Sequence, residues 1–484
     1  MYVRFGAISL LLFVSIWGSP ADSAVIQVNT TGDSINMDTR CTLREAIIAA
    51  NTDTLFMGCP AGSGDDIIEL VLDGPYVMTV AGANEDGGIT GDFDVRWHTT
   101  IRPASPTGKQ TIDADDLDRA FEVFDAARLT LERINITNGN VVGFGGAIFS
   151  QHPQSEVELI RSEIYSNQAT LFGGGIYSEG PLTLSRSSVD SNDAAFGGGI
   201  YMGTDALLLL TDSGLRGNDA TADGAGINAI NMIIESSTIE GNDAARFGGG
   251  LYWRNDTASD FSAVTNATIA ENSALEHGGG LYVSSGGTVE IRSSTIAYNG
   301  CDTDENDNGD GCGLYVDSGN LILANTLVSY NEDLSSPGSI APDCFGTVES
   351  AGYNLMSAID SSDCVITGDT TGNQVGSVAS PIDAQLDCLQ DNGGSTNTYL
   401  PLDTSPVIDA AAPAGCFDAF GQVLAIDQRG HFRHWDGPDA GDDPRCDIGA
   451  TEYGADEFND IVMSDSFGDG APKQVKGDGG CDPD

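Results

Sequence analysis

Two short sequence patterns recur through the middle of the 484-residue chain and constrain its fold more than any other feature. The first is a glycine-rich turn followed by Ile or Leu, as in "FGGGIY", and successive copies stand 24 to 33 residues apart. Its aliphatic residues are Ile148, Ile176, Ile200, Ile227, Leu251, Leu281 and Leu314. The second pattern ends in asparagine, at Asn167, Asn192, Asn218, Asn242, Asn272, Asn299 and Asn331. Eight or nine residues separate each asparagine from the next aliphatic residue, except where an insertion follows Asn299.

Between these patterns apolar and polar residues alternate, as in "VELIRSEI", which indicates β-strands with one buried face. A period in the twenties with a constant internal phase is typical of a solenoid. One repeat cannot bury its own apolar side, so the stack of repeats is the folding unit. The sequence therefore predicts an all-β parallel β-helix in which each repeat is one coil, hydrogen-bonded to the next at about 4.8 Å.

The phase of the repeat predicts where its side chains point. Neighbouring residues of a strand face opposite ways, so the aliphatic residue is expected inside and the next residue outside. The asparagines are expected to face inward at a turn, and the glycines to occupy the next turn, where coils pass closely. The expected outer column is Phe149, Tyr177, Tyr201, Asn228, Tyr252, Tyr282 and Tyr315.

The paired glycine and asparagine patterns resemble the repeats of the polymorphic outer-membrane protein family over roughly residues 130–335. That family belongs to the pectin-lyase-like superfamily, so the resemblance implies a right-handed parallel β-helix. It implies little about activity, because this superfamily includes lyases, hydrolases, adhesins and structural proteins.

The segment "CTLREAIIAAN" at 41–51 predicts a short capping α-helix. Thr42 and Glu45 have the spacing of a capping box, and apolar residues repeat at helical spacing behind them. The segment resembles the CSLREA domain of exported bacterial proteins. We expect the helix to cover the open end of the solenoid, with binding of a partner as the alternative.

Residues 405–453 resemble the choice-of-anchor Q domain through "DQRG" and "CDIGA". Asp427, Arg429, Asp447 and Glu452 are interpreted as buried charge pairs rather than as an active site. The expected organisation is a signal peptide at 1–24, a CSLREA-like cap at 25–60, the β-helix at 61–384, a choice-of-anchor Q-like module at 385–453 and an acidic, glycine-rich tail at 454–484.

The N-terminal sequence predicts export. An apolar run after Arg4, followed by small residues, is typical of a secretory signal peptide and is too short to span a bilayer. We therefore expect a secreted or outer-membrane-associated protein with no transmembrane segment after cleavage. Disulfides are the default for cysteines in such a chain. Proximity in sequence suggests the pairs Cys41–Cys59, Cys301–Cys312, Cys344–Cys364 and Cys416–Cys446, and leaves Cys388 and Cys481 over.

The chain carries a formal net charge of −52, which disfavours nucleic acid and anionic lipid as partners. Its insertion "CDTDENDNGDGC" at 301–312 contains the opening of a calcium-binding loop, although Tyr315 stands where the final Glu would be. The insertion is either a Ca²⁺ site or a solvated acidic hairpin. Its candidate ligands are Asp302, Asp304, Asn306, Asn308 and Asp310.

The sequence predicts no catalytic residues. The tyrosine column Tyr177, Tyr201, Tyr252, Tyr282 and Tyr315 either offers stacking platforms to sugars or packs upon itself. Asp190, Arg216 and Glu240 hold matching positions in successive repeats and predict a surface salt-bridge ladder. We expect a non-enzymatic surface or secreted protein, structural, adhesive or in contact with polysaccharide. The alternative is a polysaccharide lyase or glycoside hydrolase of the same fold, which would place carboxylates and a base in one groove.

Overall fold

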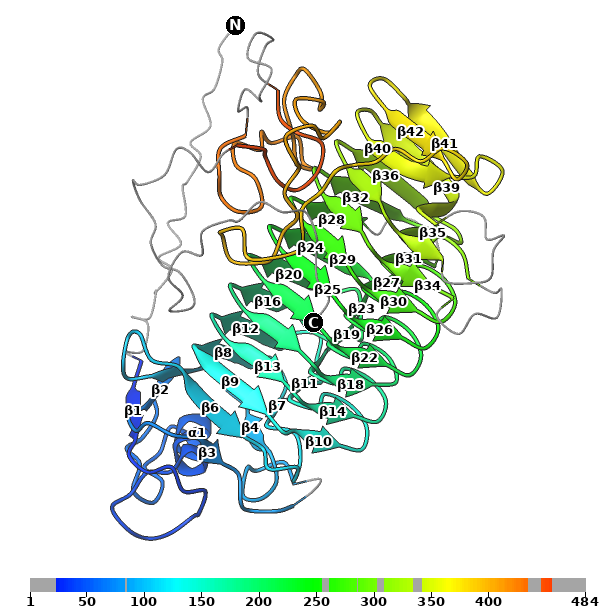
Figure 1. Ribbon diagram of the computed structural model, residues 1–484. Coiled ribbons are helices and arrows are strands. Elements are labelled where there is room, and N and C mark those ends of the chain that lie inside the picture. The colour runs from blue at the N-terminus through cyan, green and yellow to red at the C-terminus, as the bar shows by residue number, and fades with distance from the viewer. Residues whose placement is uncertain are drawn as a thin grey trace, which may run out of the picture.

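The computed structural model describes residues 23–82, 85–254, 261–284, 286–302, 309–333, 342–433 and 445–454. It is an all-β parallel β-helix (Figure 1). In the regular coils the chain forms four strands per turn, and each strand pairs in parallel with its equivalent in the next coil. The four resulting stacks are named here the first, second, third and fourth ladder, in the order in which the chain visits them.

The first ladder has the longest strands and begins with the pairing of β1 and β2. Its strands are β1 (Val25–Val28), β2 (Asp66–Leu70), β5 (Thr99–Pro103), β8 (Arg128–Glu132), β12 (Glu156–Ile160), β16 (Leu182–Ser185), β20 (Leu207–Thr211), β24 (Asn231–Glu235), β28 (Phe261–Thr265), β32 (Thr288–Arg292), β36 (Asn320–Ala324), β39 (Cys344–Ala351) and β41 (Cys364–Asp369).

The second ladder follows after a turn, in which residues such as Arg186 and Asp212 adopt positive φ. Its strands are β3 (Tyr76–Val77), β6 (Gln110–Asp113), β9 (Ile134–Thr137), β13 (Glu163–Tyr165), β17 (Ser188–Asp190), β21 (Gly214–Arg216), β25 (Thr238–Glu240), β29 (Thr268–Ala270), β33 (Thr295–Ala297), β37 (Leu327–Ser329), β40 (Leu355–Ile359) and β42 (Gln374–Ser377).

The third ladder consists of two-residue strands, and all but the first start directly after the asparagine of the repeat. They are β10 (Asn140–Val141), β14 (Gln168–Ala169), β18 (Asp193–Ala194), β22 (Asp219–Ala220), β26 (Asp243–Ala244), β30 (Ser273–Ala274), β34 (Gly300–Cys301) and β38 (Glu332–Asp333).

The fourth ladder carries the aliphatic and aromatic residues of the glycine pattern and joins the first ladder at β39. Its other strands are β4 (Phe93–Val95), β7 (Phe121–Val123), β11 (Ile148–Ser150), β15 (Ile176–Ser178), β19 (Ile200–Met202), β23 (Ile227–Ala229), β27 (Leu251–Trp253), β31 (Leu281–Val283) and β35 (Leu314–Val316).

The core confirms the predicted phase of the repeat. Ile176 and Ile200 are fully buried and in register, and so are their equivalents along the fourth ladder. The glycines are needed where the coils touch, because a Cβ on Gly174 would lie 2.4 Å from the carbonyl oxygen of Gly198. The sequence-based prediction of a parallel β-helix is therefore confirmed.

The asparagines form a continuous buried ladder inside the turn between the second and third ladders. The side-chain amide of each donates to Oδ1 of the next, at 2.8 to 3.0 Å from Asn167 to Asn331. The same Oδ1 accepts the backbone N–H of the preceding asparagine, as Oδ1 of Asn218 accepts from Asn192 at 3.0 Å. Polar groups that a tight turn would leave unsatisfied are thus paired from coil to coil.

The helix α1 (Leu43–Thr52) covers the N-terminal end, where it contacts β1, β2 and β4. The predicted capping box is present: the Glu45 backbone donates to Thr42 Oγ1 and the Thr42 backbone to Glu45 Oε2, both at 3.1 Å. Arg44 is buried against Asp33 at 2.6 Å and donates to the carbonyl of Gly91 at 2.7 Å. Among the described residues no helix is long and apolar enough to cross a membrane.

Residues 385–433 and 445–454, the described part of the predicted C-terminal module, fold back along the second ladder (orange in Figure 1). Thr238, Thr268 and Thr295 face outward on this ladder, yet the module buries all three. Their hydroxyls bond to it, for example Thr268 Oγ1 to Gln428 Oε1 at 2.7 Å. The second ladder is therefore covered from β25 to β33 and left open at β13 and β17.

The four predicted disulfides are present: Cys41–Cys59, Cys301–Cys312, Cys344–Cys364 and Cys416–Cys446. Cys388, which the sequence left over, is also disulfide-bonded. Cys481, the tail at 455–484 and most of the expected signal peptide lie outside the described residues.

Candidate functional site

The tyrosine column lies on the outer side of the fourth ladder, as its spacing predicted. Tyr177 and Tyr201 stack with ring centroids 5.6 Å apart. Further along, Tyr282 stacks between Tyr252 at 5.2 Å and Tyr315 at 4.9 Å. The rings of each pair are nearly parallel, so neighbouring tyrosines pack face to face on both sides of the coil that contains Asn228.

A second column of rings packs beside the tyrosines, formed by the residue just before the glycines. Phe172 stacks on Phe196 at 5.2 Å and reaches Tyr201 at 4.5 Å. Phe247 and His277 continue this column on the other side of the coil that contains Asn228. Together the two columns form an aromatic seam that joins successive coils.

The coil at Asn228 interrupts both columns, because Asp223 replaces the phenylalanine and Asn228 the tyrosine. Two arginines fill the gap. Arg246 forms an ion pair with Asp223 and lies 4.9 Å from the ring centre of Phe247. Arg254 lies over the ring of Tyr201 at 4.4 Å and donates to its hydroxyl at 2.8 Å. The irregularity is therefore occupied by protein side chains.

Of the candidate calcium ligands in the 301–312 insertion, Asp304, Asn306 and Asn308 lie outside the described residues. Asp302 is fully buried. Burial, reinforced by the carboxylates of Asp333, Asp363 and Asp302, raises the pKa of Asp310. The ends of the insertion, which the Cys301–Cys312 disulfide joins, thus lie in an acidic environment.

The open stretch of the second ladder contains a cavity of about 320 Å³, which we call the second-ladder groove. Ser188 and Gly214 form its floor and are in register on β17 and β21. Because these residues have little or no side chain, they leave the space above the strands open. The larger side chains Lys109 and Glu163 border it toward the N-terminal coils, and Ser395 of the C-terminal module borders it at the other end.

Charged side chains of both signs line the two sides of the groove. Arg186 and Asp212 stand on the turn that precedes the second ladder and lie 3.8 Å apart. On the other side Arg216 lies 3.8 Å from Asp190 and 3.1 Å from Glu240, so the predicted salt-bridge ladder is present. Donors and acceptors therefore alternate along the axis of the solenoid.

Burial raises the pKa of Asp190 to about 6, because desolvation outweighs the bond from Ser188 and the charge of Arg216. Its Oδ2 accepts from Ser188 Oγ at 2.6 Å, whereas its buried Oδ1 has no hydrogen-bond partner and lies near Arg216. Burial also raises the pKa of Asp212, partly offset by Arg186. The groove thus holds carboxylates that take up protons more readily than free side chains do.

Arginines occupy the same turn position in three successive coils, and one of them, Arg186, lines the groove. Arg133, Arg161 and Arg186 each follow the last residue of a first-ladder strand, and these last residues are in register. All three adopt positive φ at the same turn. The backbone therefore repeats the same arginine-bearing turn in three successive coils.

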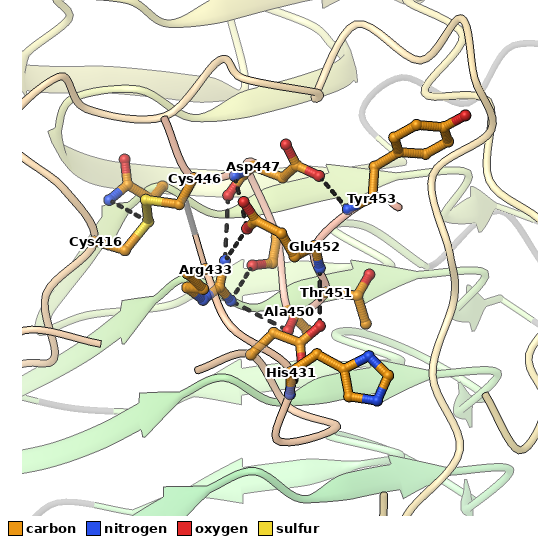
Figure 2. Close-up of polar contacts among 12 residues, drawn as sticks. Cys416, His431, Arg433, Cys446, Asp447, Ala450, Thr451, Glu452 and Tyr453 are labelled. Carbon is orange, nitrogen blue, oxygen red and sulfur yellow. Dashed lines mark hydrogen bonds and ion pairs between the residues drawn. A yellow bond between two sulfur atoms is a disulfide. The ribbon is translucent and has the colours of Figure 1, made fainter. Parts of the chain in front are cut away.

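The C-terminal module contains the four charged residues that the sequence singled out, and Figure 2 labels two of them, Asp447 and Glu452. Arg429 forms an ion pair with Asp427 at 2.8 Å, and both are buried. Arg433 lies 3.5 Å from Glu452 and donates to the carbonyls of Gly449 and Ala450 at 2.9 and 3.1 Å. These contacts hold the module together.

Buried Asp447 completes this network. Its Oδ1 accepts the backbone N–H of Asp409 at 2.8 Å, and its Oδ2 accepts that of Tyr453 at 2.6 Å (Figure 2). Burial raises its pKa well above the usual value, with Glu452 as the next cause. The interpretation of Asp427, Arg429, Asp447 and Glu452 as buried, bonded charges agrees with these contacts.

The sequence did not single out Lys109, Arg186, Asp212 or Ser188 as site residues. Only the second-ladder positions carried a signal, since Asp190, Arg216 and Glu240 hold matching positions in successive repeats. Arg186 and Asp212 stand at a turn, and the distant C-terminal module contributes Ser395 to one end of the groove. No protein-family model, curated protein or solved structure matches the chain.

Proposed function

We propose that this chain is an exported β-helix protein that contacts glycans through the second-ladder groove without cleaving them. The observation that carries the proposal is the open stretch of the second ladder. Arg186 and Arg216 offer donors, Glu163 and Asp190 offer acceptors, and a serine floor lies between them. Such a mixture of hydrogen-bond donors and acceptors suits a ligand rich in hydroxyl groups.

Export is supported by the four described disulfides, since such bonds persist in oxidising compartments. The apolar segment in 1–24 supports the same conclusion. The resemblances to the polymorphic outer-membrane protein, CSLREA and choice-of-anchor Q families extend the proposal to a pectin-lyase-like protein that is secreted or held at the outer membrane. Cell fractionation tests this, and a cytoplasmic, reduced protein would contradict it.

The groove is tested by filling it. Ser188→Trp places a large ring on the floor between Glu163 and Gly214, whereas Thr183→Trp places the same ring on the outer face of β16 in the same coil. Binding to a panel of neutral and acidic polysaccharides is measured by calorimetry. We expect Ser188→Trp to weaken binding at least ten-fold and Thr183→Trp to leave it unchanged. Equal binding by wild type and both variants would refute the groove as the site.

The tyrosine column is the other surface proposed for glycan contact, and a variant in this column distinguishes it from the groove. Tyr252→Phe keeps the stacked ring and removes only its hydroxyl. If this variant loses glycan binding and Ser188→Trp retains it, the ligand lies on the fourth ladder and not on the second.

The second candidate function is a glycoside hydrolase acting in the same groove. It is favoured by Asp190, whose pKa of about 6 suits a carboxylic acid that protonates a leaving group. Carboxylates and basic side chains meet there, as an enzyme of this fold requires. Release of new reducing ends from the panel, with and without Ca²⁺, distinguishes the two functions, whereas unsaturated ends would indicate a lyase, because only β-elimination forms them. Product formation that Asp190→Asn abolishes would establish the hydrolase and refute non-enzymatic binding.

A further inference from the structure

A cluster of three carboxylates lies at the N-terminal end of the fourth ladder, away from the groove. Asp94 on β4 and Glu122 on β7 are in register, and Asp92 immediately precedes β4. The outer column of this ladder thus begins with two carboxylates and continues, from Glu122 onward, with Phe149. A column that is otherwise aromatic becomes acidic where the chain packs against the capping helix.

The three side chains converge closely enough to share one ion. One carboxylate oxygen of each lies within 4.8 Å of the corresponding oxygens of the other two. Calcium binds oxygen ligands at 2.3–2.6 Å, so two ligands of one ion stand at most about 5 Å apart. Asp94 is fully buried and Asp92 only 6% exposed, so any ion between them would be largely enclosed by protein.

The cluster is short of positive charge. Arg119 forms ion pairs with Glu122 at 2.7 Å and Asp92 at 3.5 Å. One guanidinium against three carboxylates leaves a formal charge of −2, which burial makes costly. A divalent cation would neutralise this charge.

An unsatisfied atom points to a ligand at the cluster. Oδ2 of Asp94 accepts the backbone N–H of Gly88 at 2.5 Å, but its Oδ1 is buried without any hydrogen-bond partner. A buried carboxylate oxygen without a partner is rare, because the oxygen has lost its hydration and gained nothing in return. Glu122, by contrast, is held at both oxygens, by Arg119 and by Gln151 at 2.7 Å.

We propose that Asp92, Asp94 and Glu122 bind one divalent cation, with water completing its coordination. Ca²⁺ suits the cluster better than Mg²⁺, because Mg²⁺ requires near-ideal octahedral geometry and these carboxylates are already fixed by other bonds. The ion would secure the 85–94 segment, whose carbonyls at Gly88, Gly91 and Asp92 bind Arg44 of the capping helix. It would thus fasten the N-terminal cap to the first coils.

The test must separate this site from the 301–312 insertion. The full chain is freed of metal with a chelator, and Ca²⁺ and Mg²⁺ uptake are each measured by calorimetry. Asp94→Asn and Glu122→Gln alter the proposed site, Asp304→Asn alters the insertion, and Asp219→Asn on β22 is the control at an acidic surface position.

We expect Asp304→Asn and Asp219→Asn to keep one equivalent of Ca²⁺ that Asp94→Asn and Glu122→Gln lose. We also expect Ca²⁺ to raise the melting temperature of every chain that keeps this equivalent. If Asp94→Asn fails to fold, the comparison of Ca²⁺ uptake by Asp304→Asn with Ca²⁺ uptake by Glu122→Gln still tests the proposed site. Absence of uptake by Asp304→Asn, or equal uptake by Glu122→Gln and wild type, would overturn the proposal. Uptake of Mg²⁺ in place of Ca²⁺ would refute the preference for Ca²⁺.

Discussion

The side-chain amide of Asn331 donates to Oδ1 of Asp343 at 2.9 Å, so the buried asparagine ladder ends on a carboxylate. Oδ2 of Asp343 accepts the backbone N–H of Ala358 at 2.6 Å. An eighth asparagine at this place would present its amide nitrogen to one of these two donors. A carboxylate, which only accepts, satisfies both and ends the ladder without an unpaired group.

The interior of the ladder should be sensitive to any truncation. Asn218→Ala removes a donor to Val189 and Asn242, and leaves the backbone N–H of Asn192 buried without its acceptor. We expect the free energy of unfolding to fall by about 3 kcal/mol, since more than one buried group loses its partner. Urea denaturation followed by circular dichroism measures this. Asn135→Ala, at a partly exposed position on β9, is the control and should cost less than about 1 kcal/mol.

Asp343 should make stability depend on pH. Burial raises its pKa from 3.8 to about 6, while the bonds from Asn331, Ala358 and Ser357 oppose the shift. Between these values the folded chain holds a proton that the unfolded chain releases. The contribution of Asp343 to stability is therefore complete below about pH 4 and is lost as the pH rises through about 6. At about 1.4 kcal/mol per unit, the loss amounts to about 3 kcal/mol.

Comparison with Asp343→Asn isolates this effect, because the many other carboxylates cancel in the difference. We expect the stability of wild type relative to the variant to decrease from pH 4 to pH 7 in urea denaturation. A difference that stays constant, or that grows with pH, would show that Asp343 is not protonated in the folded chain.

The repeat made the scaffold predictable from sequence. Ile176, Asn192 and Tyr201 have the same burial, bonding and stacking roles as their equivalents one coil away. The same pattern of residue types therefore recurs many times along the chain. The capping box at Thr42 and Glu45 was equally readable, because all its contacts are local. The four disulfides followed from proximity for the same reason.

The groove could not be predicted, because it depends on contacts that no local pattern encodes. Thr238 and Gln428 are 190 residues apart, yet their side chains bond at 2.8 Å and help to decide which coils are covered. Lys109, far along the chain from Arg186, borders the same hollow. The partnership of Arg44 with Asp33 was hidden for another reason: an arginine in an amphipathic helix is ordinarily expected at the surface.

The aromatic seam should act first as a structural element. Tyr282 is 8% exposed and its ring packs between those of Tyr252 and Tyr315. We expect Tyr282→Ala to lower the free energy of unfolding by about 3 kcal/mol, because the ring leaves a cavity. Tyr282→Phe keeps the ring and should change stability by less than about 1 kcal/mol.

Chemical denaturation and near-ultraviolet circular dichroism measure both effects. Tyr165→Ala, on the outer face of β13, removes a ring from outside the seam and serves as the control. A small loss for Tyr282→Ala, similar to that of the control, would argue against a structural role of the seam.

Arg433 should be essential to the attachment of the C-terminal module. It is buried, forms an ion pair with Glu452 and donates to Asn266 Oδ1 at 2.7 Å, across the boundary with the β-helix. Arg433→Met keeps the length of the side chain but leaves the buried carboxylate uncompensated. Breaking a buried pair in this way costs about 3–5 kcal/mol. We therefore expect the module to detach while the coils stay folded.

Hydrogen exchange and limited proteolysis follow this detachment. Protection should fall in residues 385–433 and at the outward threonines Thr238 and Thr268, and should persist at the buried asparagine ladder. The matched control is Arg292→Met, which breaks the partly exposed pair with Glu290 on β32 and should cost no more than about 1 kcal/mol. Uniform loss of protection over the whole chain would contradict the prediction, because it would mean that the module and the coils unfold as one unit.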